Sequence, residues 1–388
     1  MGKIELIATS TFGLEEMVKI EVRNLGYEQM TVENGKVTFT CDTYAIPRAN
    51  LWLRTADRVL LKMGEFKATS FEQLFERTKA LPWEEWIPEN GKFPVNGKSI
   101  KSQLFSVSDC QAIVKKAIVE RLKEHYDTEW FEEDGEEFPI EVALLKDVAT
   151  LTIDTSGQGL HKRGYREKAN EAPLKETLAA AMVMISRWRE DRVLIDPMCG
   201  SGTIAIEAAM LGKNIAPGLE RKFVSQGWER IPEKAWKDAR VEALKAIRQD
   251  EDIKIFASDM DEKAVEIAKE NACNAGVEDC ITFAVGDMAT IRSNEKYGYI
   301  ICNPPYGERL GEKKEVQQLY ARMGKVFKKL DTWSTYIITS DEDFEKLYGK
   351  RASKKRKLYN GRIKVDYYQF FGPKPPKEML GEYRKKDI

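Results

Sequence analysis

Alternating strand-like and helix-like segments from residue 174 onward most constrain how this chain can fold. Short apolar runs at 193–196, 253–258, 281–285, 299–302 and 335–339 have the length of buried strands, and most are separated by segments with helical spacing. Strands that alternate with helices form a parallel sheet covered on both faces. We therefore predict a Rossmann-like, doubly wound α/β domain over 174–388, closed by an edge hairpin that includes residues 365–371.

The first 64 residues have a different order of elements, namely strand, helix, strand, strand, helix and strand. This order is typical of a ferredoxin-like α+β domain. The central hairpin turns at Asn34-Gly35, a dipeptide that favours a type I′ turn.

Residues 65–158 predict a second α+β unit. A helix is expected over 108–125, and the apolar alternation at 140–145 and 149–154 indicates two closing strands. Residues 159–173 are rich in glycine and basic side chains, which is typical of a linker between domains.

Composition disfavours several classes of function. The chain has 388 residues and a net charge of −1, so only local basic patches could bind nucleic acid. No apolar run reaches the roughly twenty residues that span a bilayer, and the first residues do not resemble a signal peptide. Six cysteines without a CxxC pair and only two histidines disfavour a zinc site or a Ser-His-Asp triad. We expect a cytoplasmic protein with no metal and no membrane partner.

A glycine-rich turn follows the first strand of the predicted parallel sheet. The strand ends in Asp196 and is followed by Pro197-Met-Cys199-Gly200-Ser-Gly202-Thr203, directly before a helix. Glycines between a strand and a helix let a ligand approach the backbone closely. The turn matches neither the P-loop nor the full GxGxxG pattern, and Asp196 would repel phosphate but suits a cationic or hydroxyl-rich ligand. The alternative is an ordinary tight turn.

Two further carboxylates follow the next two predicted strands, Asp259 and Asp287. Ligands of open α/β sheets bind at the carboxyl ends of the strands, so Asp259 is placed to hold ribose hydroxyls and Asp287 to hold an adenine amine. Asp261 is a rival for the ribose role. Each acid alone is more often a helix cap than a ligand, but three acids at consecutive strand ends favour a binding site.

Asn303-Pro304-Pro305-Tyr306 follows the apolar run at 299–302 and forms the candidate catalytic loop. The prolines fix φ and remove backbone donors, so the loop is rigid. An amide oxygen and a carbonyl can accept both hydrogens of an exocyclic amine, while the base stacks on Tyr306. Such hydrogen bonds raise the nucleophilicity of the amine nitrogen, and no strong base is then needed. The alternative is a proline-rich turn without a ligand.

Taken together, four segments resemble the ordered motifs of class I S-adenosylmethionine-dependent methyltransferases. They are residues 196–203, 257–261, 285–287 and 303–310. The extended form of the last segment is similar to the group that makes N2-methylguanosine in RNA. The front half resembles the ferredoxin-like and THUMP RNA-binding domains of that group, through residues 102–119 and 161–176. The resemblance covers nearly the whole chain and is closest to the bacterial enzymes of large-subunit rRNA.

The resemblance implies S-adenosylmethionine as cofactor and a guanosine of RNA as substrate, with 23S rRNA expected and tRNA as the alternative. The implied catalytic residues are Asn303, Pro304, Pro305 and Tyr306. Asn303 and the Pro304 carbonyl would orient the N2 amine, and Tyr306 would stack on the base. The implied cofactor-binding residues are Asp196, Pro197, Cys199, Gly200, Gly202, Thr203, Asp259, Asp287 and Asn303.

Two basic segments are candidates for RNA contacts. Residues 350–365 hold eight basic side chains and no acid, and the strongest candidates among them are Lys354, Lys355, Arg356 and Lys357. A solvated strand edge is the alternative. Lys162, Arg163 and Arg166 form a weaker second patch, which could equally belong to a linker.

The segment 213–250 is longer than an ordinary connection between a helix and a strand. Residues 221–223 and Trp228 could form part of a substrate lid, but packing in the core of an inserted helix is the favoured interpretation for Trp228 and Trp236. The length of the segment alone does not separate the two.

Two rival functions remain open. Methyltransferases of DNA adenine or cytosine amines also use an Asn/Asp-Pro-Pro-aromatic loop, although the THUMP-like half favours RNA. The other rival is an RNA-binding assembly factor with an inactive transferase site, against which the intact motif residues argue.

Overall fold

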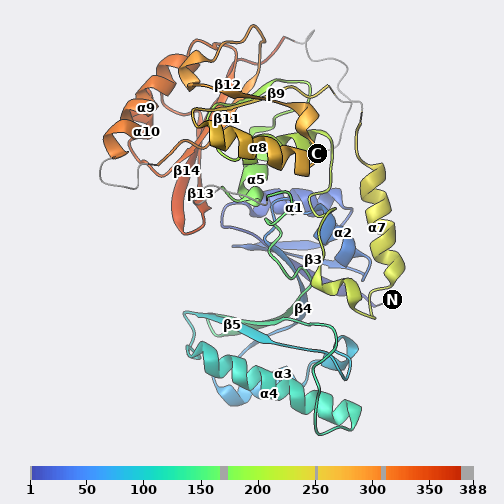
Figure 1. The fold of residues 1–388 in the computed structure, drawn as a ribbon. Helices are drawn as coiled ribbons and strands as arrows, with labels where there is room; N and C mark the ends of the chain where they lie inside the picture. The colour runs from blue at the N-terminus through green and yellow to red at the C-terminus, as the bar shows by residue number, and fades with distance from the viewer. Residues whose placement is uncertain (1, 167–173, 250–251, 307–311, 377–388) are drawn as a thin grey trace. The chain divides into compact units, whose positions relative to one another are not determined.

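The computed structural model describes residues 2–166, 174–249, 252–306 and 312–376. The described chain forms two compact units, each built on a seven-stranded sheet (Figure 1). Neither unit is continuous in sequence. The first unit comprises Met1–Ser10, Glu21–Leu160 and Arg221–Glu242, and the second comprises Thr11–Ile20, His161–Glu220 and Ala243–Ile388.

The first sheet has the order β2-β3-β1-β4-β7-β6-β5. The elements along this part of the chain are β1 (Ile4–Thr9), α1 (Glu15–Asn24), β2 (Met30–Glu33), β3 (Lys36–Cys41), α2 (Ala45–Trp52), β4 (Arg58–Lys67), α3 (Phe71–Lys79), β5 (Val95–Ile100), α4 (Val107–Tyr126), β6 (Ile140–Leu145) and β7 (Val148–Asp154). The predicted ferredoxin-like order is confirmed. The type I′ turn is wrong, because Gly35 has a φ of 75° but Asn34 has no positive φ.

Strand β4 belongs to both halves of this sheet. It pairs antiparallel with β1 on one side and with β7 on the other, with a register shift between Lys62 and Gly64. The predicted boundary after residue 64 therefore falls inside a strand that the ferredoxin-like and THUMP-like halves share. Helices α3 and α4 pack against each other, and α4 packs on β5 (Figure 1).

The segment Arg221–Glu242 packs in the core of the first unit, although it lies after the first strand of the second sheet. It contains the turn Val224–Gly227 and most of α7 (Glu233–Lys245). The Trp228 ring is 1 % exposed and stacks on Phe138 with 4.7 Å between ring centroids, and its Nε1 donates to the Glu137 carbonyl at 3.0 Å. Trp236, also buried, stacks on Phe223. The packing interpretation of both tryptophans is confirmed.

The second sheet has the order β10-β9-β8-β11-β12-β14-β13. Its elements are α5 (Glu176–Ser186), β8 (Leu194–Asp196), α6 (Thr203–Gly212), β9 (Ile255–Asp259), α8 (Glu262–Asn274), β10 (Ile281–Val285), β11 (Tyr299–Cys302), α9 (Glu312–Phe327), β12 (Ser334–Thr339), α10 (Phe344–Tyr348), β13 (Lys354–Asn360) and β14 (Ile363–Phe370). The strands from β10 to β12 are parallel, and β14 and β13 form an antiparallel hairpin at the edge. Both the doubly wound sheet and the edge hairpin were predicted.

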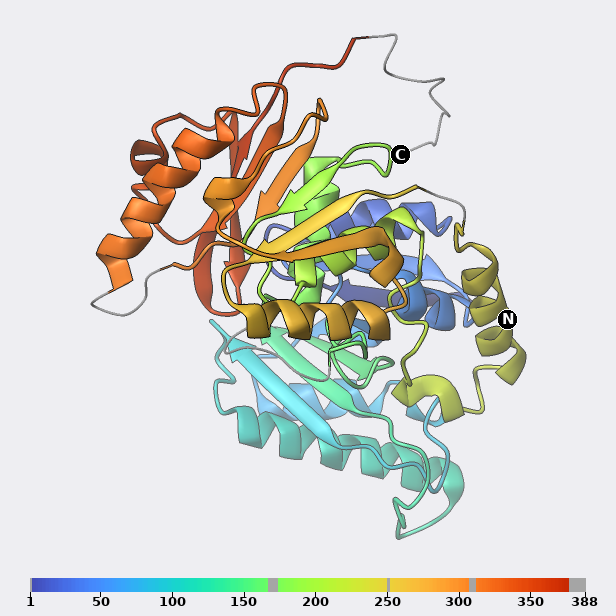
Figure 2. The same ribbon diagram turned by 45° about the horizontal axis from the view of Figure 1, so that its top comes forward.

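Neighbouring residues of these strands point into two separate cores, because side chains alternate across a strand. In β11, Ile301 packs into a core with residues of α5, α6 and α8, whereas Ile300 and Cys302 pack with residues of α9 and α10. Figure 2 shows α9 and α8 on opposite sides of the sheet. Continuous apolar runs such as 299–302 are therefore required by burial on both faces.

None of the helices in the described ranges combines the length and apolar character needed to cross a bilayer.

The first unit should lose stability when Trp228 is truncated. We expect Trp228→Ala to lower the free energy of unfolding by about 3–5 kcal/mol, because a fully buried, stacked ring is replaced by a cavity. Hydrogen exchange should become faster in peptides that contain Phe138, and urea unfolding should begin at lower concentration. The matched control is Trp130→Ala, because the Trp130 side chain is 77 % exposed. Equal effects of the two substitutions would contradict this packing.

Candidate active site

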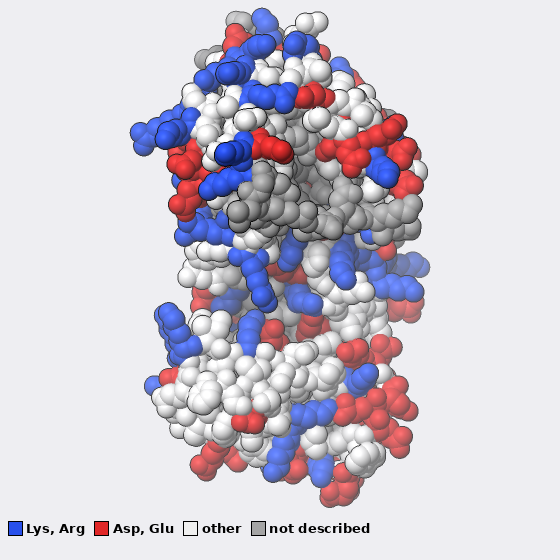
Figure 3. Space-filling view, turned by 60° about the vertical axis from the view of Figure 1, so that its left-hand side comes forward, with Lys and Arg blue, Asp and Glu red and all other residues white. Residues whose placement is uncertain are grey.

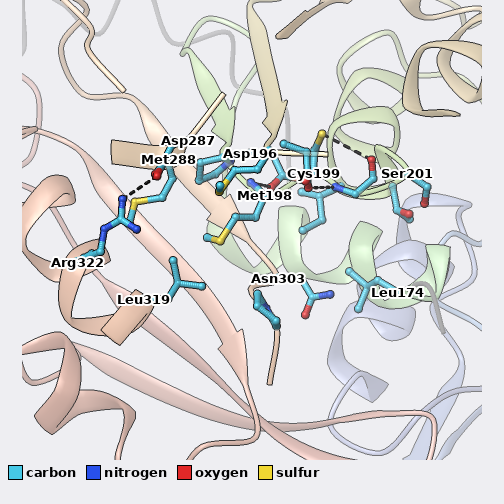
Figure 4. A pocket seen from close by; sticks show the side chains of 17 residues that line it. Leu174, Asp196, Met198, Cys199, Ser201, Asp287, Met288, Asn303, Leu319 and Arg322 are labelled. Atoms are coloured by element: carbon cyan, nitrogen blue, oxygen red, sulfur yellow. Dashed lines mark hydrogen bonds and ion pairs between the residues drawn. The ribbon is translucent and has the colours of Figure 1, made fainter. Parts of the chain in front are cut away.

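A cavity of about 370 Å³ lies in the second unit at the carboxyl ends of the central strands. Figure 4 shows side chains from several strand ends and from α9 around it. We call it the strand-end cavity. Its lining residues are Leu174, Asp196, Pro197, Met198, Cys199, Gly200, Ser201, Thr203, Ile204, Asp259, Met260, Asp287, Met288, Asn303, Pro305, Leu319 and Arg322.

Most of the predicted site residues line this cavity. Of the predicted catalytic and cofactor-binding residues, only Gly202, Pro304 and Tyr306 are absent from the lining, although each is next to a lining residue in sequence. The structure thus brings together three acids, the glycine turn and Asn303 from separate parts of the chain. Sequence reasoning missed the residues contributed by α9, Leu319 and Arg322, because nothing in a helical apolar pattern shows which turn reaches a cavity.

The glycine turn has the backbone that its sequence requires. Gly200 and Gly202 have φ values of 50° and 82°, and a Cβ added at Gly202 would lie 3.0 Å from the Ala268 Cβ. Glycine at residue 202 therefore allows both the left-handed turn and close packing of α6 on α8. The buried Asn271 side chain of α8 donates to the Ser201 carbonyl at 3.0 Å and fixes the turn from behind. Asn271 was not predicted from sequence.

Asp259 connects β9 to the glycine turn. Its Oδ2 accepts from the Gly200 N–H at 2.9 Å and its Oδ1 accepts from the Asp261 N–H at 3.1 Å. Asp261 instead caps α8 by accepting from the Lys263 N–H at 3.0 Å, and it does not line the cavity. These contacts favour Asp259 over Asp261 as the residue that faces a ligand.

Asp196 is a buried carboxyl group at the base of the cavity, only 1 % exposed. Burial raises its pKa to about 8, the Met198 N–H opposes this rise, and the negative charge of Asp259 adds to it. Among the described residues, its carboxylate accepts a hydrogen bond from the Met198 N–H at 3.4 Å. A buried carboxylate that has no positive partner and only one long hydrogen bond among the described residues favours a ligand that brings positive charge.

Asp287 lies across the cavity, next to Arg322, the one arginine among the described residues that line it. The carboxylate accepts from the Ala289 N–H at 2.8 Å and from Arg322 of α9 at 2.7 Å (Figure 4). The Ala289 N–H and the Arg322 guanidinium hold the pKa of Asp287 below its usual range. Asp287 is therefore ionised at neutral pH.

The Asn303–Tyr306 loop is fixed by two tyrosine hydroxyls. Tyr306 donates to Asn303 Oδ1 at 2.7 Å, and its ring packs against the core on the α5 side of the sheet. Tyr320 of α9, itself buried, donates to the Pro305 carbonyl at 2.9 Å and lies 2.8 Å from the Thr339 hydroxyl. Tyr320 was not predicted as a site residue. With both ends of the loop held, the Asn303 amide faces the cavity in a fixed orientation.

The predicted patch of Lys162, Arg163 and Arg166 is wrong in part. Arg163 is 3 % exposed and its guanidinium donates to Glu207, which is fully buried. The Arg166 side chain is 12 % exposed and lies 3.4 Å from Glu176. Neither arginine presents its charge to solvent, because each neutralises a buried acid. Only Lys162 is exposed.

The second basic segment forms the edge strand β13. Lys354, Lys355 and Lys357 are exposed, and Arg356 is partly buried. Figure 3 brings forward the side on which β13 and β14 lie in Figure 1, and Lys and Arg side chains gather on it. Lys355 lies 3.5 Å from Asp366 and above the Tyr368 ring, so part of its charge is compensated within the hairpin.

Comparison with family models divides the chain in the same order as the sequence predicted. The model described as an RMKL-like methyltransferase domain matches residues 163–369, the RlmL ferredoxin-like domain matches 5–60, and the THUMP domain matches 68–154.

Several similar proteins cover nearly the whole chain. A Bacillus subtilis (strain 168) protein named "Putative RNA methyltransferase YpsC" is 56 % identical over 98 % of this chain and 100 % of its own. A Listeria monocytogenes structure described as "a predicted N6-adenine-specific DNA methylase" is 54 % identical, with a TM-score of 0.92 over 96 % of this chain and 97 % of its own. SMU.472, "a putative methyltransferase complexed with SAH", is 45 % identical, with a TM-score of 0.92 over 97 % of this chain and 100 % of its own.

The matches extend over both units. The predicted resemblance to methyltransferases with a THUMP domain is thereby confirmed. The chain belongs to the family of RMKL-like methyltransferases that carry RlmL-type ferredoxin-like and THUMP domains.

Proposed function

We propose that this protein transfers a methyl group from S-adenosylmethionine to the exocyclic N2 amine of a guanosine in RNA. The observation that carries the proposal is that Asn303 of the rigid Pro-Pro loop and the acids Asp196, Asp259 and Asp287 face one cavity. The cavity thus combines acceptors for an amine with acids suited to a cationic, hydroxyl-bearing cofactor.

The residues of the strand-end cavity fit S-adenosylmethionine. The cofactor carries an ammonium and a sulfonium, and the buried Asp196 lacks a positive partner among the described residues. Asp259 is assigned to the ribose hydroxyls and Asp287 to the adenine amine, in the order of the strands. The relative SMU.472 was crystallised with SAH, the demethylated product of this cofactor. When bound, the cofactor supplies an electrophilic methyl group.

The chain itself contributes orientation and charge placement. An amide oxygen has two acceptor sites, so Asn303 Oδ1 can accept one amine hydrogen while it accepts from Tyr306 at 2.7 Å. The Pro304 carbonyl is assigned to the second hydrogen, and Tyr306 and Pro305 to contacts with the base. Tyr320 holds the Pro305 carbonyl, which limits movement of the loop. Fixed acceptors of this kind cost little reorganisation during the reaction.

RNA is favoured as the substrate by the THUMP domain and by the name of the Bacillus subtilis relative. The description of the Listeria structure names a DNA methylase, so duplex DNA is included as a substrate in the test below. We prefer 23S rRNA to tRNA because the sequence motifs most resemble those of the bacterial enzymes of large-subunit rRNA. All six cysteines are unpaired, which suits the reducing cytoplasm in which we place the activity.

The edge strand β13 is assigned to phosphate contacts. Side chains alternate along a strand, so Lys355 and Lys357 share one face, while Lys354 and Arg356 share the other. Because the net charge of the chain is −1, such contacts must come from local clusters of this kind.

A nucleoside-resolved transfer assay tests the proposal. The protein would be incubated with labelled S-adenosylmethionine and, separately, with 23S rRNA, tRNA and duplex DNA, and the digested nucleosides would be identified by mass spectrometry. We expect N2-methylguanosine in 23S rRNA. N6-methyladenine in DNA would contradict the proposal. So would cofactor binding without transfer to any nucleic acid, which is the result expected of an assembly factor.

Two loop variants refine this assay. Asn303→Ala should abolish transfer and leave cofactor affinity nearly unchanged, because the amide is assigned to the acceptor amine. Tyr320→Phe removes one hydrogen bond to the loop and should slow transfer by about tenfold, the effect of roughly 1.4 kcal/mol. If Asn303→Ala abolished cofactor binding as well, the residue would instead support the cofactor or the fold.

Cofactor affinity should increase with pH up to about 8. The Asp196 carboxyl is protonated below its pKa of about 8, and a cationic cofactor favours its ionised form, so binding must release a proton. Affinity should therefore rise by up to about tenfold per pH unit below this pKa and then level off.

Calorimetry in two buffers of different ionisation enthalpy measures this proton release. The Asp196→Asn variant should bind the cofactor more weakly and should lose the proton release that Asp196 causes. Any pH dependence that remains in this variant reports titration of the cofactor's own amine. A wild-type profile that matched the profile of Asp196→Asn would refute the assigned role.

Neutralising one face of β13 should weaken RNA binding. Lys355→Gln with Lys357→Gln should reduce affinity for 23S rRNA fragments and lower the slope of log affinity against log salt by about one for each lost phosphate contact. The matched control is Lys263→Gln with Lys269→Gln on α8, since both side chains are exposed in the same unit. An unchanged salt slope in the β13 variant would mean that its lysines only solvate the sheet edge.

A further inference from the structure

We propose that Phe12 and Tyr359 form a stacking platform for an unpaired RNA base outside the strand-end cavity. The inference rests on the proposed RNA substrate and deepens it, because it assigns a place to a second nucleotide, apart from the one that is methylated. Both aromatic residues belong to the second unit, and neither is part of the cavity lining.

Phe12 is held in an exposed position by the residues that follow it. It is 48 % exposed, whereas Leu14 is fully buried in the core of the second unit. The Leu14 N–H donates to the Thr11 carbonyl at 3.1 Å, which closes a tight turn with Phe12 and Gly13 at its centre. Gly13, whose φ is 93°, packs closely against the Lys357 carbonyl of β13. The backbone of Phe12 is therefore fixed beside β13, while its ring remains accessible to solvent.

The Phe12 ring contacts a second aromatic ring, that of Tyr359 in β13. Tyr359 is partly exposed, its ring centroid lies 6.1 Å from that of Phe12, and the two ring planes are inclined at 79°. An edge-to-face pair uses one face of one ring and only the edge of the other, so the rings do not cover each other. A single exposed phenylalanine is ordinary on a protein surface. Two adjacent accessible rings, however, offer a π surface on which a base of any type can stack.

Basic side chains flank the two rings. Lys357 shares a face of β13 with Tyr359, because side chains alternate along a strand. Lys364 is paired with Tyr359 across the hairpin, and Arg362 is exposed at the turn between the strands. Lys364 lies 3.4 Å from Glu342, but Lys357 and Arg362 form no ion pair with any described residue. Uncompensated cations beside exposed aromatic rings suit the phosphates of a strand whose base stacks on those rings.

The platform lies at the same end of the sheet as the strand-end cavity. Asp366 of β14 is paired with Thr339, the last residue of β12. Tyr359 is paired with Lys364, two residues nearer the hairpin turn, so it lies about 7 Å beyond the carboxyl ends of the parallel strands (Figure 1). Two strands separate β13 from β11, a distance of about 14 Å at the usual strand spacing. A base on the platform therefore belongs to another nucleotide than the one presented to Asn303.

Such a platform assists the exposure of the target base. A guanosine in structured RNA must leave its stack before its amine can reach the cavity, which costs stacking energy. Rings that stack on a neighbouring base replace part of the lost stacking, and Lys357 and Arg362 are placed to hold the adjoining phosphates.

Two RNA probes separate base stacking from phosphate binding. The affinity of the full-length protein for a short oligouridylate, and for an abasic oligoribonucleotide of the same length, would be measured by fluorescence anisotropy. The wild type should prefer the oligouridylate. Phe12→Leu keeps an apolar side chain but removes the aromatic face, so it should reduce this preference by about tenfold and leave affinity for the abasic oligomer nearly unchanged. Phe12→Trp should keep the preference.

Two further variants identify the partners of the platform. Tyr359→Leu should reduce the preference as Phe12→Leu does, and the double variant should be little weaker than either, because the two rings act together. Arg362→Gln should instead weaken binding of both oligomers and lower the slope of log affinity against log salt by about one.

Phe371→Leu is the matched control. Phe371 is 49 % exposed in the same unit, but it follows Phe370, which is paired with Thr335 at the opposite end of the sheet. Its substitution should leave the preference for oligouridylate unchanged.

Equal weakening of both oligomers by Phe12→Leu would overturn the inference, and so would an equal effect of Phe371→Leu. Unchanged binding of both oligomers by Phe12→Leu would also overturn it, since that result is expected of rings that only cover the edge of β13 or dock another protein. Neither measurement involves methyl transfer. A protein that showed the base preference but made no N2-methylguanosine would contradict the proposed function alone, and one that methylated RNA without the preference would contradict this inference alone.

Discussion

The parallel register of the central strands is the constraint on which the site depends. Asp196 of β8 pairs with Ala257 of β9, so Asp259 lies two residues further along its strand. The pairing of Asp259 with Val285 in turn places Asp287 two residues beyond the end of β10. On the other side, β11 pairs with β8 and ends next to Asn303. A shift of one residue in any pair would move an acid to the opposite face of the sheet.

Much of this arrangement could be predicted from sequence, because burial on both faces leaves a continuous apolar run. Strand β11, in which three of four residues are buried, has the predicted bounds for that reason. Strand β10 also has the predicted bounds, although it lies at the sheet edge and three of its five residues are exposed. Strand β5 was not among the predicted strands, because its residues alternate between partly buried and exposed at a sheet edge and include Asn96, Gly97 and Lys98. The site acids were predictable because they follow strands, whereas Tyr320 and Asn271 lie inside helices whose patterns indicate only burial.

The positions of Arg163 and Arg166 in the structure differ from those expected from the sequence. Residues 159–166 have the composition of a linker, yet Arg163 and Arg166 are directed to Glu207 and Glu176. Both acids lie in helices that are almost wholly buried, and an acid in such a helix requires a positive partner. An acid at the start of an apolar helical segment, such as Glu176, or within one, such as Glu207, is therefore the signal in the sequence that could have identified these arginines as structural.

Each compact unit includes a segment from the part of the chain that mainly builds the other unit. The boundaries of the units therefore differ from the domain boundaries along the sequence. Leu14 of the first 64 residues is fully buried in the second unit's core with Leu358 and Val365. At Gly13, where φ is 93°, a Cβ would lie 2.8 Å from the Lys357 carbonyl, so glycine allows the close approach to β13. In the opposite direction, Trp228 completes the core of the first unit beside Phe138.

A fragment that began after residue 160 would therefore lose Leu14 from one core and expose Trp228 and Trp236 of the other. Deleting residues 1–160 cannot be a clean test of what they contribute, because the remaining fragment would be destabilised through loss of packing alone. Substitutions of the exposed lysines of β13 remove no residue from either core, which makes them the better way to test the proposed RNA contacts separately from the proposed methyl transfer.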